Sequence, residues 1–209
     1  MAMFGKNKEN EISSKSSHST TIITECMKIK GTINGCGMIH VDGSILGDLI
    51  IDENVVIGIN GIVRGNVKAK KVMISGKLEG SVICDTLEVT KTGSISDKIN
   101  AKTILSDGTL DATILAENSI HITENGKVTT GRMQARHITV NGNIDGDVTA
   151  SELLEINKDG QVKGTMKVKK IKVTEGGLML GTMLTYDSAD SMKPIDKKEK
   201  LDTKSRENK

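Results

Sequence analysis

The stretch that decides the fold is Asn141-Gly142-Asn143-Ile144-Asp145-Gly146-Asp147-Val148, in which a turn-prone residue and a glycine precede aliphatic residues two and six positions after that glycine. A turn-prone residue followed by glycine recurs at eight places: Asp42-Gly43, Asn60-Gly61, Ser75-Gly76, Thr92-Gly93, Asp107-Gly108, Asn125-Gly126, Asn141-Gly142 and Asp159-Gly160. The position two residues after the glycine is aliphatic in all eight. The body of the chain is therefore a repeat.

Three further regularities define the repeat. Six positions after the glycine an apolar residue stands in seven repeats, and the Gly126 repeat has its apolar residue one position late, at Met133. Five repeats have a second glycine four positions after the first: Gly47, Gly65, Gly80, Gly146 and Gly164. The intervals between the first glycines are 18, 15, 17, 15, 18, 16 and 18 residues, which places the extra residues of the longer units at one corner. We expect positive φ at the corner glycines and close passage of neighbouring backbones at the second glycines.

The apolar residues alternate with period two, and no helical period is present. Asn-Gly and Asp-Gly between strands also suit an antiparallel meander or barrel. Units of about 17 residues with three aliphatic points favour instead a coil with three short faces, stacked on similar coils as a single-stranded parallel β-helix. Ten coils at about 4.8 Å make a rod of roughly 45 Å. This all-β domain is predicted over residues 20–184, with a disordered leader at 1–19 and a disordered charged tail at 185–209.

Composition and charge exclude several functions. The chain has one Phe, one Tyr and no Trp, and residues 21–186 carry 19 basic and 19 acidic side chains, so neither a basic stripe nor an aromatic platform for nucleic acid is expected. No apolar run approaches the roughly 20 residues of a membrane span. The three cysteines, Cys26, Cys36 and Cys84, include no CxxC pair and indicate a reducing, cytoplasmic compartment without a disulfide framework or a metal site.

Both ends of the predicted rod are apolar and have no recognisable cap. The last coil, at residues 176–184, is the most apolar stretch of the body, and the first contains an isoleucine pair and a methionine. An uncapped sheet edge invites strand addition, so we predict end-to-end assembly through Ile22, Ile23, Met27, Met179, Leu180, Met183 and Leu184. The alternative is that these side chains close their own coils beneath the two tails.

Short glycine-punctuated β repeats, flanked by a polar leader that begins Met3-Phe4-Gly5-Lys6 and by a charged tail, resemble the bactofilins. The resemblance implies a right-handed parallel β-helix that polymerises without nucleotide into non-polar filaments on the inner face of the cytoplasmic membrane. It further implies a cytoskeletal scaffold in bacterial cell shape or cell-wall organisation, with cell-wall-modifying enzymes or morphogenesis factors as partners. The predicted body is longer than in many bactofilins.

The leader carries the residues with which we expect the chain to bind membranes. Met3 and Phe4 are apolar enough to enter the lipid interface, and Lys6 and Lys8 can meet anionic head groups. One copy of the leader would bind a membrane weakly, whereas a filament displays many copies, which together would bind firmly. The alternative is a flexible N-terminus without lipid contact.

Two other functions fit a β-solenoid. A left-handed hexapeptide-repeat acyltransferase also has about 18 residues per coil, but units alternating between 15 and 18 residues do not keep a six-residue register. A monomeric protein-binding module would present one flat face.

The histidines give no sign of a reactive site. Period-two alternation directs His40 and His121 to solvent, and His18 and His137 have no evident carboxylate or cysteine partner. We therefore predict no catalytic, cofactor-binding or metal-binding residue, and no cofactor.

Overall fold

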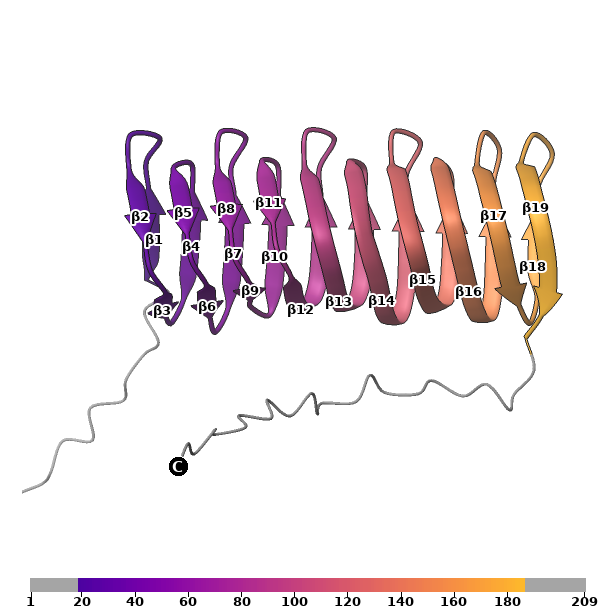
Figure 1. Cartoon of the computed structure of the whole chain (residues 1–209), viewed down its shortest axis with the longest axis horizontal. Coiled ribbons are helices and arrows are strands. Elements are labelled where there is room, and N and C mark those ends of the chain that lie inside the picture. Colours follow the sequence, from indigo (N-terminus) through magenta and orange to yellow (C-terminus); the bar gives the residue numbers. More distant parts are fainter. Residues whose placement is uncertain (1–18, 187–209) are drawn as a thin grey trace, which may run out of the picture.

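The computed structural model describes residues 19–186, which form a solenoid of parallel β-strands without a helix. Ten coils lie side by side in chain order, from β1 at one end of the rod to β19 at the other (Figure 1). Every strand pairing among them is parallel, and each strand of the inner coils pairs with strands of the coil before and the coil after. The parallel β-helix is confirmed, and the antiparallel alternative is wrong for the described residues.

The strands are short where the corners interrupt them and long where they run through a corner. The short strands are β1 Thr20–Ile23, β2 Lys28–Lys30, β3 Ile33–Gly35, β4 Met38–Val41, β5 Ser44–Leu46, β6 Leu49–Ile51, β7 Asn54–Ile57, β8 Ile62–Arg64, β9 Val67–Lys68, β10 Lys71–Ile74, β11 Lys77–Glu79 and β18 Ile171–Val173. The long strands are β12 Val82–Val89, β13 Ser94–Ser106, β14 Thr109–Ile122, β15 Lys127–Val140, β16 Asn143–Ile156, β17 Gln161–Val168 and β19 Leu178–Thr185.

Each coil has three faces. Face A begins the coil and is formed in the first three coils by β1, β4 and β7, face B by β2, β5 and β8, and face C by β3, β6 and β9. In the later coils one long strand supplies two or three faces, because strand pairing resumes directly after each bend, with a register shift at some corners. Coil 1 therefore spans residues 20–35, coil 2 spans 38–51, and coil 10 spans 171–185.

The core is a stack of aliphatic side chains that repeats in register. The residues two positions after the corner glycines, such as Val63, Leu78 and Leu110, are fully buried, as their alternation with polar neighbours predicts. Met133 is also fully buried, although its repeat is one residue longer. A register shift between Thr130 and Met133 absorbs the extra residue, so the position six residues after the glycine is filled in this coil as well.

The extra residues of the longer units lie at the corner between faces A and B. Four-residue and two-residue turns alternate at this corner from coil 1 to coil 9, and coil 10 again has a four-residue turn (Figure 1). The four-residue turns lie at 24–27, 58–61, 90–93, 123–126, 157–160 and 174–177. Each long turn is closed by a backbone hydrogen bond, such as that from the Gly61 amide to the Gly58 carbonyl at 2.9 Å. The prediction that the extra residues share one corner is confirmed.

The expectation of positive φ at the corner glycines is wrong. These residues keep ordinary φ values, and a Cβ on Gly43 would instead lie 2.5 Å from the Met27 carbonyl oxygen and 2.6 Å from that of Thr24 in the preceding coil. Positive φ belongs to the second glycines, Gly47, Gly65, Gly80, Gly146 and Gly164, with values between +127 and +146°. They turn the chain from face B to face C, where each also passes close to the backbone of the coil before it.

Candidate assembly interface

Both ends of the described rod leave strand edges without a partner. In coil 1, β1, β2 and β3 pair only with strands of coil 2. In coil 10, β18 and β19 pair only with strands of coil 9. Among residues 19–186 each end therefore presents backbone N–H and C=O groups that can accept a further strand.

The end formed by coil 10 exposes side chains that would belong to the core of a longer rod. Met183 stands in register with the fully buried Met166, and Val173 with the fully buried Ile156. Met183 is nevertheless 52% exposed, because no further coil covers it in the described part of the chain. This end of the rod is thus an open cross-section of the aliphatic core.

The outward positions of coil 10 are apolar as well, which distinguishes it from the coil before. Three exposed leucines replace the polar residues Gln161, Lys163 and Lys167 of coil 9 at the same register positions: Leu178, Leu180 and Leu184. Leu180 is 50% exposed. These three leucines form an exposed apolar surface at this end of the described rod.

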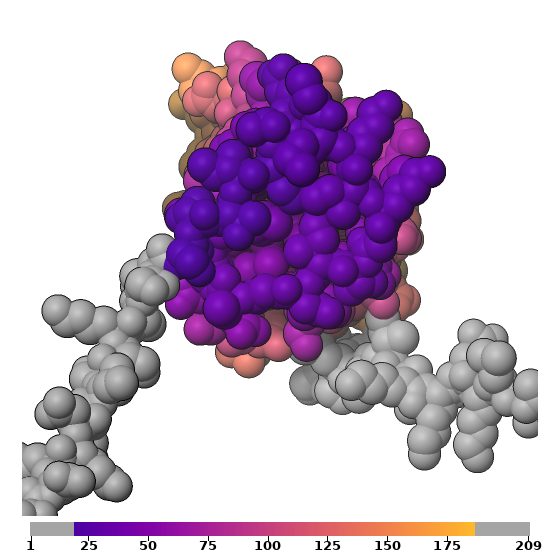
Figure 2. Space-filling view, turned by 90° about the vertical axis from the view of Figure 1, so that its left-hand side faces the viewer, coloured from indigo at the N-terminus to yellow at the C-terminus, as the bar shows by residue number. Residues whose placement is uncertain are grey.

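The end formed by coil 1 is apolar but less open, and Figure 2 looks directly at it. Ile29 and Ile33 are half-buried and stand in register with the buried Ile45 and Leu49 of coil 2. Ile22 points outward at 61% exposure, and Met27 is exposed in the first long turn. Lys28 and Lys30 flank this apolar centre as exposed charges.

The structure groups most of the residues predicted for assembly at the two ends, with one exception. Ile23 is only 3% exposed, because its side chain lies over Gly43 and fills the core of coil 1. Sequence reasoning also missed four end residues: Ile29, Ile33, Val173 and Leu178. These four residues can be recognised only by aligning each end coil with the coil beside it. The alignment shows whether an apolar side chain continues the core or replaces a polar surface residue.

Polar contacts between successive coils lie along the sides of the rod. Arg64 donates a hydrogen bond to the Glu79 carboxylate at 2.8 Å, and Lys172 contacts Glu155 at 2.5 Å. A hydrogen bond from Lys77 is the main cause that lowers the pKa of Glu79. These polar contacts link neighbouring coils along the sides, where apolar side chains such as Ile50 and Ile83 are also exposed.

The histidines do not form a reactive centre. His40 and His121 are partly exposed, as predicted, and His40 lies 2.9 Å from Asp42. The prediction that His137 has no carboxylate partner is wrong, because its Nε2 lies 3.2 Å from Glu152 on the next coil. That pairing depends on coil register, which spacing along the chain does not reveal. His18 lies outside the described residues.

The cysteines are free in the structure, and only Cys84 is buried. Burial, with a contribution from the charge of Asp85, raises the pKa of the Cys84 thiol to about 12, so it stays protonated at neutral pH. Within residues 19–186 no three His, Cys, Asp or Glu side chains gather as metal ligands would, and no helix there is long and apolar enough to cross a membrane. The predicted lipid-binding residues Met3, Phe4, Lys6 and Lys8 lie outside the described part of the chain.

Comparisons with known proteins agree with this architecture. The family model described as "Bactofilin: Polymer-forming cytoskeletal" matches residues 21–106 and again residues 101–183. The curated protein Bactofilin BacP of Myxococcus xanthus (strain DK1622) is 27% identical over 100 residues, which are 47% of this chain and 42% of that protein. The match thus spans less than half the length of this relative. No solved structure matches the chain significantly.

Proposed function

The chain belongs to the bactofilin family of cytoskeletal proteins, and we propose that it polymerises end to end, without nucleotide, into filaments that act as a membrane-associated scaffold. The observation that carries this proposal is that both ends of the described rod, residues 19–186, are apolar and have unpaired strand edges. Each end combines unpaired strand edges with side chains that continue the core. Stacking one rod on another would satisfy both at once, because the next coil supplies hydrogen-bond partners and covers the apolar groups.

The energetics favour stacking without an energy source. Full burial of a methionine or leucine side chain contributes about 1.5–3 kcal/mol, and the exposed end residues are already about half covered, so each would add about 1 kcal/mol. Several such residues at one end, together with new ladder hydrogen bonds, are of the size needed for association at micromolar concentration. Nucleotide hydrolysis is not needed for a contact of this kind.

The experiment that tests the polymerisation combines sedimentation with negative-stain electron microscopy, in the absence of nucleotide. Met183→Asp places a charge in the apolar end and should raise the concentration needed for assembly by at least about tenfold. Ile59→Asp is the matched control, because Ile59 is similarly exposed, at 63%, but lies in a turn on the side of the rod. Monomers of the wild-type protein at high concentration would contradict the proposal and favour the monomeric binding module.

For membrane attachment we propose the leader residues Met3, Phe4, Lys6 and Lys8. The apolar side chains would enter the lipid interface, and each lysine adds about 1 kcal/mol of attraction to an anionic surface. Many leaders along one filament would convert weak individual binding into stable attachment. Flotation with anionic liposomes tests this, since wild-type filaments should float and Phe4→Ser filaments should remain below. Equal flotation of both would exclude the anchor.

At the cellular level, the family suggests a scaffold that organises cell shape or the cell wall from the inner face of the cytoplasmic membrane. Its partners would be cell-wall-modifying enzymes or morphogenesis factors that bind the filament. Co-purification of such enzymes with wild-type filaments, and their loss with Met183→Asp, is the result expected of a scaffold. Equal recovery with both would show that the partners bind single subunits.

A further inference from the structure

A row of alternating charges runs along the corner where face C of one coil leads into face A of the next. Each of the corners after coils 2 to 9 holds an exposed charged residue, and the sign changes at every step: Asp52, Lys70, Asp85, Lys102, Glu117, Arg136, Glu152 and Lys169. These eight residues are called the corner ladder below. Glu53 and Lys170 add a second charge of the same sign at its two ends.

Stacking within the chain explains only part of this alternation. Equivalent positions of successive coils lie about 4.8 Å apart, so a row of like charges would repel itself. Asp85 and Lys102, on successive coils, form an ion pair in which Nζ lies 2.7 Å from Oδ1. Glu152 lies 3.2 Å from His137 Nε2. Within residues 19–186 five members of the ladder have no ion pair: Asp52, Lys70, Glu117, Arg136 and Lys169.

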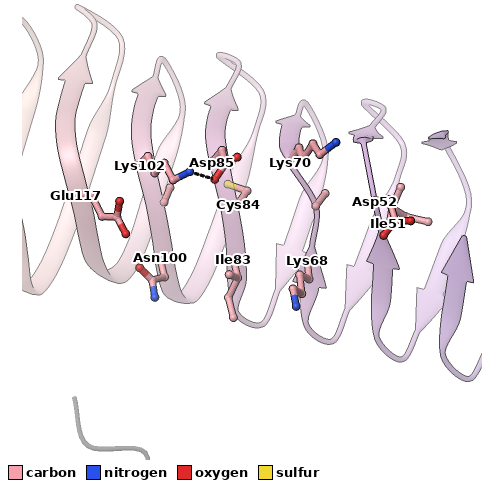
Figure 3. Close-up of a pocket in the computed structure, with 12 residues that line it drawn as sticks. Ile51, Asp52, Lys68, Lys70, Ile83, Cys84, Asp85, Asn100, Lys102 and Glu117 are labelled. Atoms are coloured by element: carbon pink, nitrogen blue, oxygen red, sulfur yellow. Dashed lines mark ion pairs between the residues drawn. The ribbon is translucent and has the colours of Figure 1, made fainter. Parts of the chain in front are cut away.

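A furrow of about 340 Å³ runs beside the first five members of the ladder, from Asp52 to Glu117. One wall is the ladder itself, and the other is the outward row of face C that contains Lys68, Ile83 and Asn100 (Figure 3). Small side chains line the furrow between them, with Ala69 and Ala101 among them. The exposed charges therefore stand beside a hollow that can receive side chains from another molecule.

We propose that the corner ladder is a docking surface for a second copy of this chain, laid alongside the first in the opposite direction. The ladder has eight charges of alternating sign, so reversing its direction exchanges positive and negative charge at every corner. An antiparallel copy therefore places an opposite charge against each member of the ladder. Lys102 would face the partner's Glu117 at the centre, and Asp85 would face the partner's Arg136. The arrangement has a two-fold axis between the corners after coils 5 and 6.

The two ends of the ladder support the same orientation. The corner with two acidic residues, Asp52 and Glu53, would lie against the corner with two basic residues, Lys169 and Lys170. A parallel copy in register would instead meet a like charge at every corner, which is unfavourable. A parallel copy shifted by one coil would leave a charge unmatched at each end. The antiparallel arrangement alone matches the whole ladder.

Zero-length carbodiimide crosslinking of the full-length protein tests the proposal. Asp52 and Lys169 are seven coils apart, or about 34 Å within one chain, so an amide bond between them must join two copies. We expect this crosslink in mass spectra at low salt, and at least about fivefold less of it in 0.5 M NaCl. Crosslinks confined to neighbouring coils, or to lysines beyond residue 186, would overturn the proposal.

A charge exchange separates contacts between copies from contacts within one copy. One variant carries Lys102→Glu and Arg136→Glu, and the other carries Asp85→Lys and Glu117→Lys. Each alone faces like charges in its own antiparallel pair, so each should lose the Asp52–Lys169 crosslink at least about fivefold, whereas an equimolar mixture should regain it. If both variants keep the wild-type circular dichroism spectrum and the mixture stays uncrosslinked, the ladder acts only within the chain. If either variant misfolds, the wild-type crosslink and its salt dependence decide.

The side contact is independent of end-to-end stacking, and the two can fail separately. Met183→Asp changes the end formed by coil 10, so it should raise the concentration needed for filaments and keep the Asp52–Lys169 crosslink. If the wild-type protein forms filaments but gives no crosslink, the side contact is refuted and end-to-end polymerisation is supported. If it gives the crosslink but forms no filaments, polymerisation is refuted and the side contact is supported.

Discussion

Replacing Gly80 with alanine should destabilise the solenoid far more than its single methyl group suggests. Gly80 has φ +145°, a conformation that residues with a side chain rarely adopt. A Cβ there would overlap the carbonyl oxygen of Gly65 in the preceding coil and lie 2.8 Å from its carbonyl carbon. The strained backbone costs about 1–3 kcal/mol, and forcing the two coils apart costs about 1–3 kcal/mol more. The expected loss is about 2–6 kcal/mol.

Gly131 supplies the matched control on the same solenoid. It is exposed, its φ lies outside the positive range, and a Cβ there would meet no atom within 4 Å. Gly131→Ala should therefore stabilise the fold slightly, by about 0.4–1 kcal/mol, because it restricts the unfolded chain.

Guanidinium denaturation followed by circular dichroism compares the two variants with the wild type. Both substitutions leave the ends unchanged, so assembly affects the three proteins equally. A loss below about 0.5 kcal/mol for Gly80→Ala would refute the close approach of coils at the second glycines, since that is the ordinary range for a neutral surface change. A comparable loss for Gly131→Ala would refute the distinction between the two positions.

Three further predictions concern buried and charged groups along the rod. Ser106 is fully buried and, among the described side chains, its hydroxyl has no hydrogen-bond partner, so Ser106→Ala should raise the free energy of unfolding by about 1 kcal/mol; a loss of stability would contradict this. Cys84 should resist a thiol reagent at pH 8 while the exposed Cys26 and Cys36 react, and labelling of all three in the native protein would contradict its burial. Hydrogen bonds from Thr123 and then from Asn125 lower the pKa of Asp107. The ionised carboxylate therefore stabilises the fold fully above the unfolded pKa of about 4, and this stabilisation is lost as pH falls through the lower folded pKa. The difference in melting temperature between wild type and Asp107→Asn should shrink from pH 7 to pH 3, and a constant difference would argue against a stabilising role of the carboxylate.

Local sequence rules were sufficient for the fold because each unit repeats the same turn and the same alternation. The fully buried Val63 and Leu78 follow from their distance to the corner glycines. The close passage of backbones at the second glycines was also predicted, but the positions with positive φ were not, since a requirement for glycine arises either from backbone conformation or from a neighbouring coil. Gly43 is restricted by carbonyl groups of the coil before, and Gly80 by both effects.

The candidate interfaces were predicted only in part, because they depend on register between coils. Apolarity selected Leu180 and Met183, which are exposed at the end of the rod, and also Ile23, which the first coil buries. The pairing of His137 with Glu152 and the alternating corner ladder join residues that lie one coil apart. Spacing along the chain varies from coil to coil, so such neighbours become visible only when the coils are superposed.

Electron cryomicroscopy of the filaments tests end-to-end stacking most directly. If the rods stack along their axes, strands lie across the filament, and its images should show a reflection near 4.8 Å along the axis. The subunit repeat should be about 48 Å for ten coils, or about twice that where neighbouring subunits point in opposite directions. A filament whose strands run along its axis, with a repeat unrelated to coil spacing, would contradict assembly through the open ends.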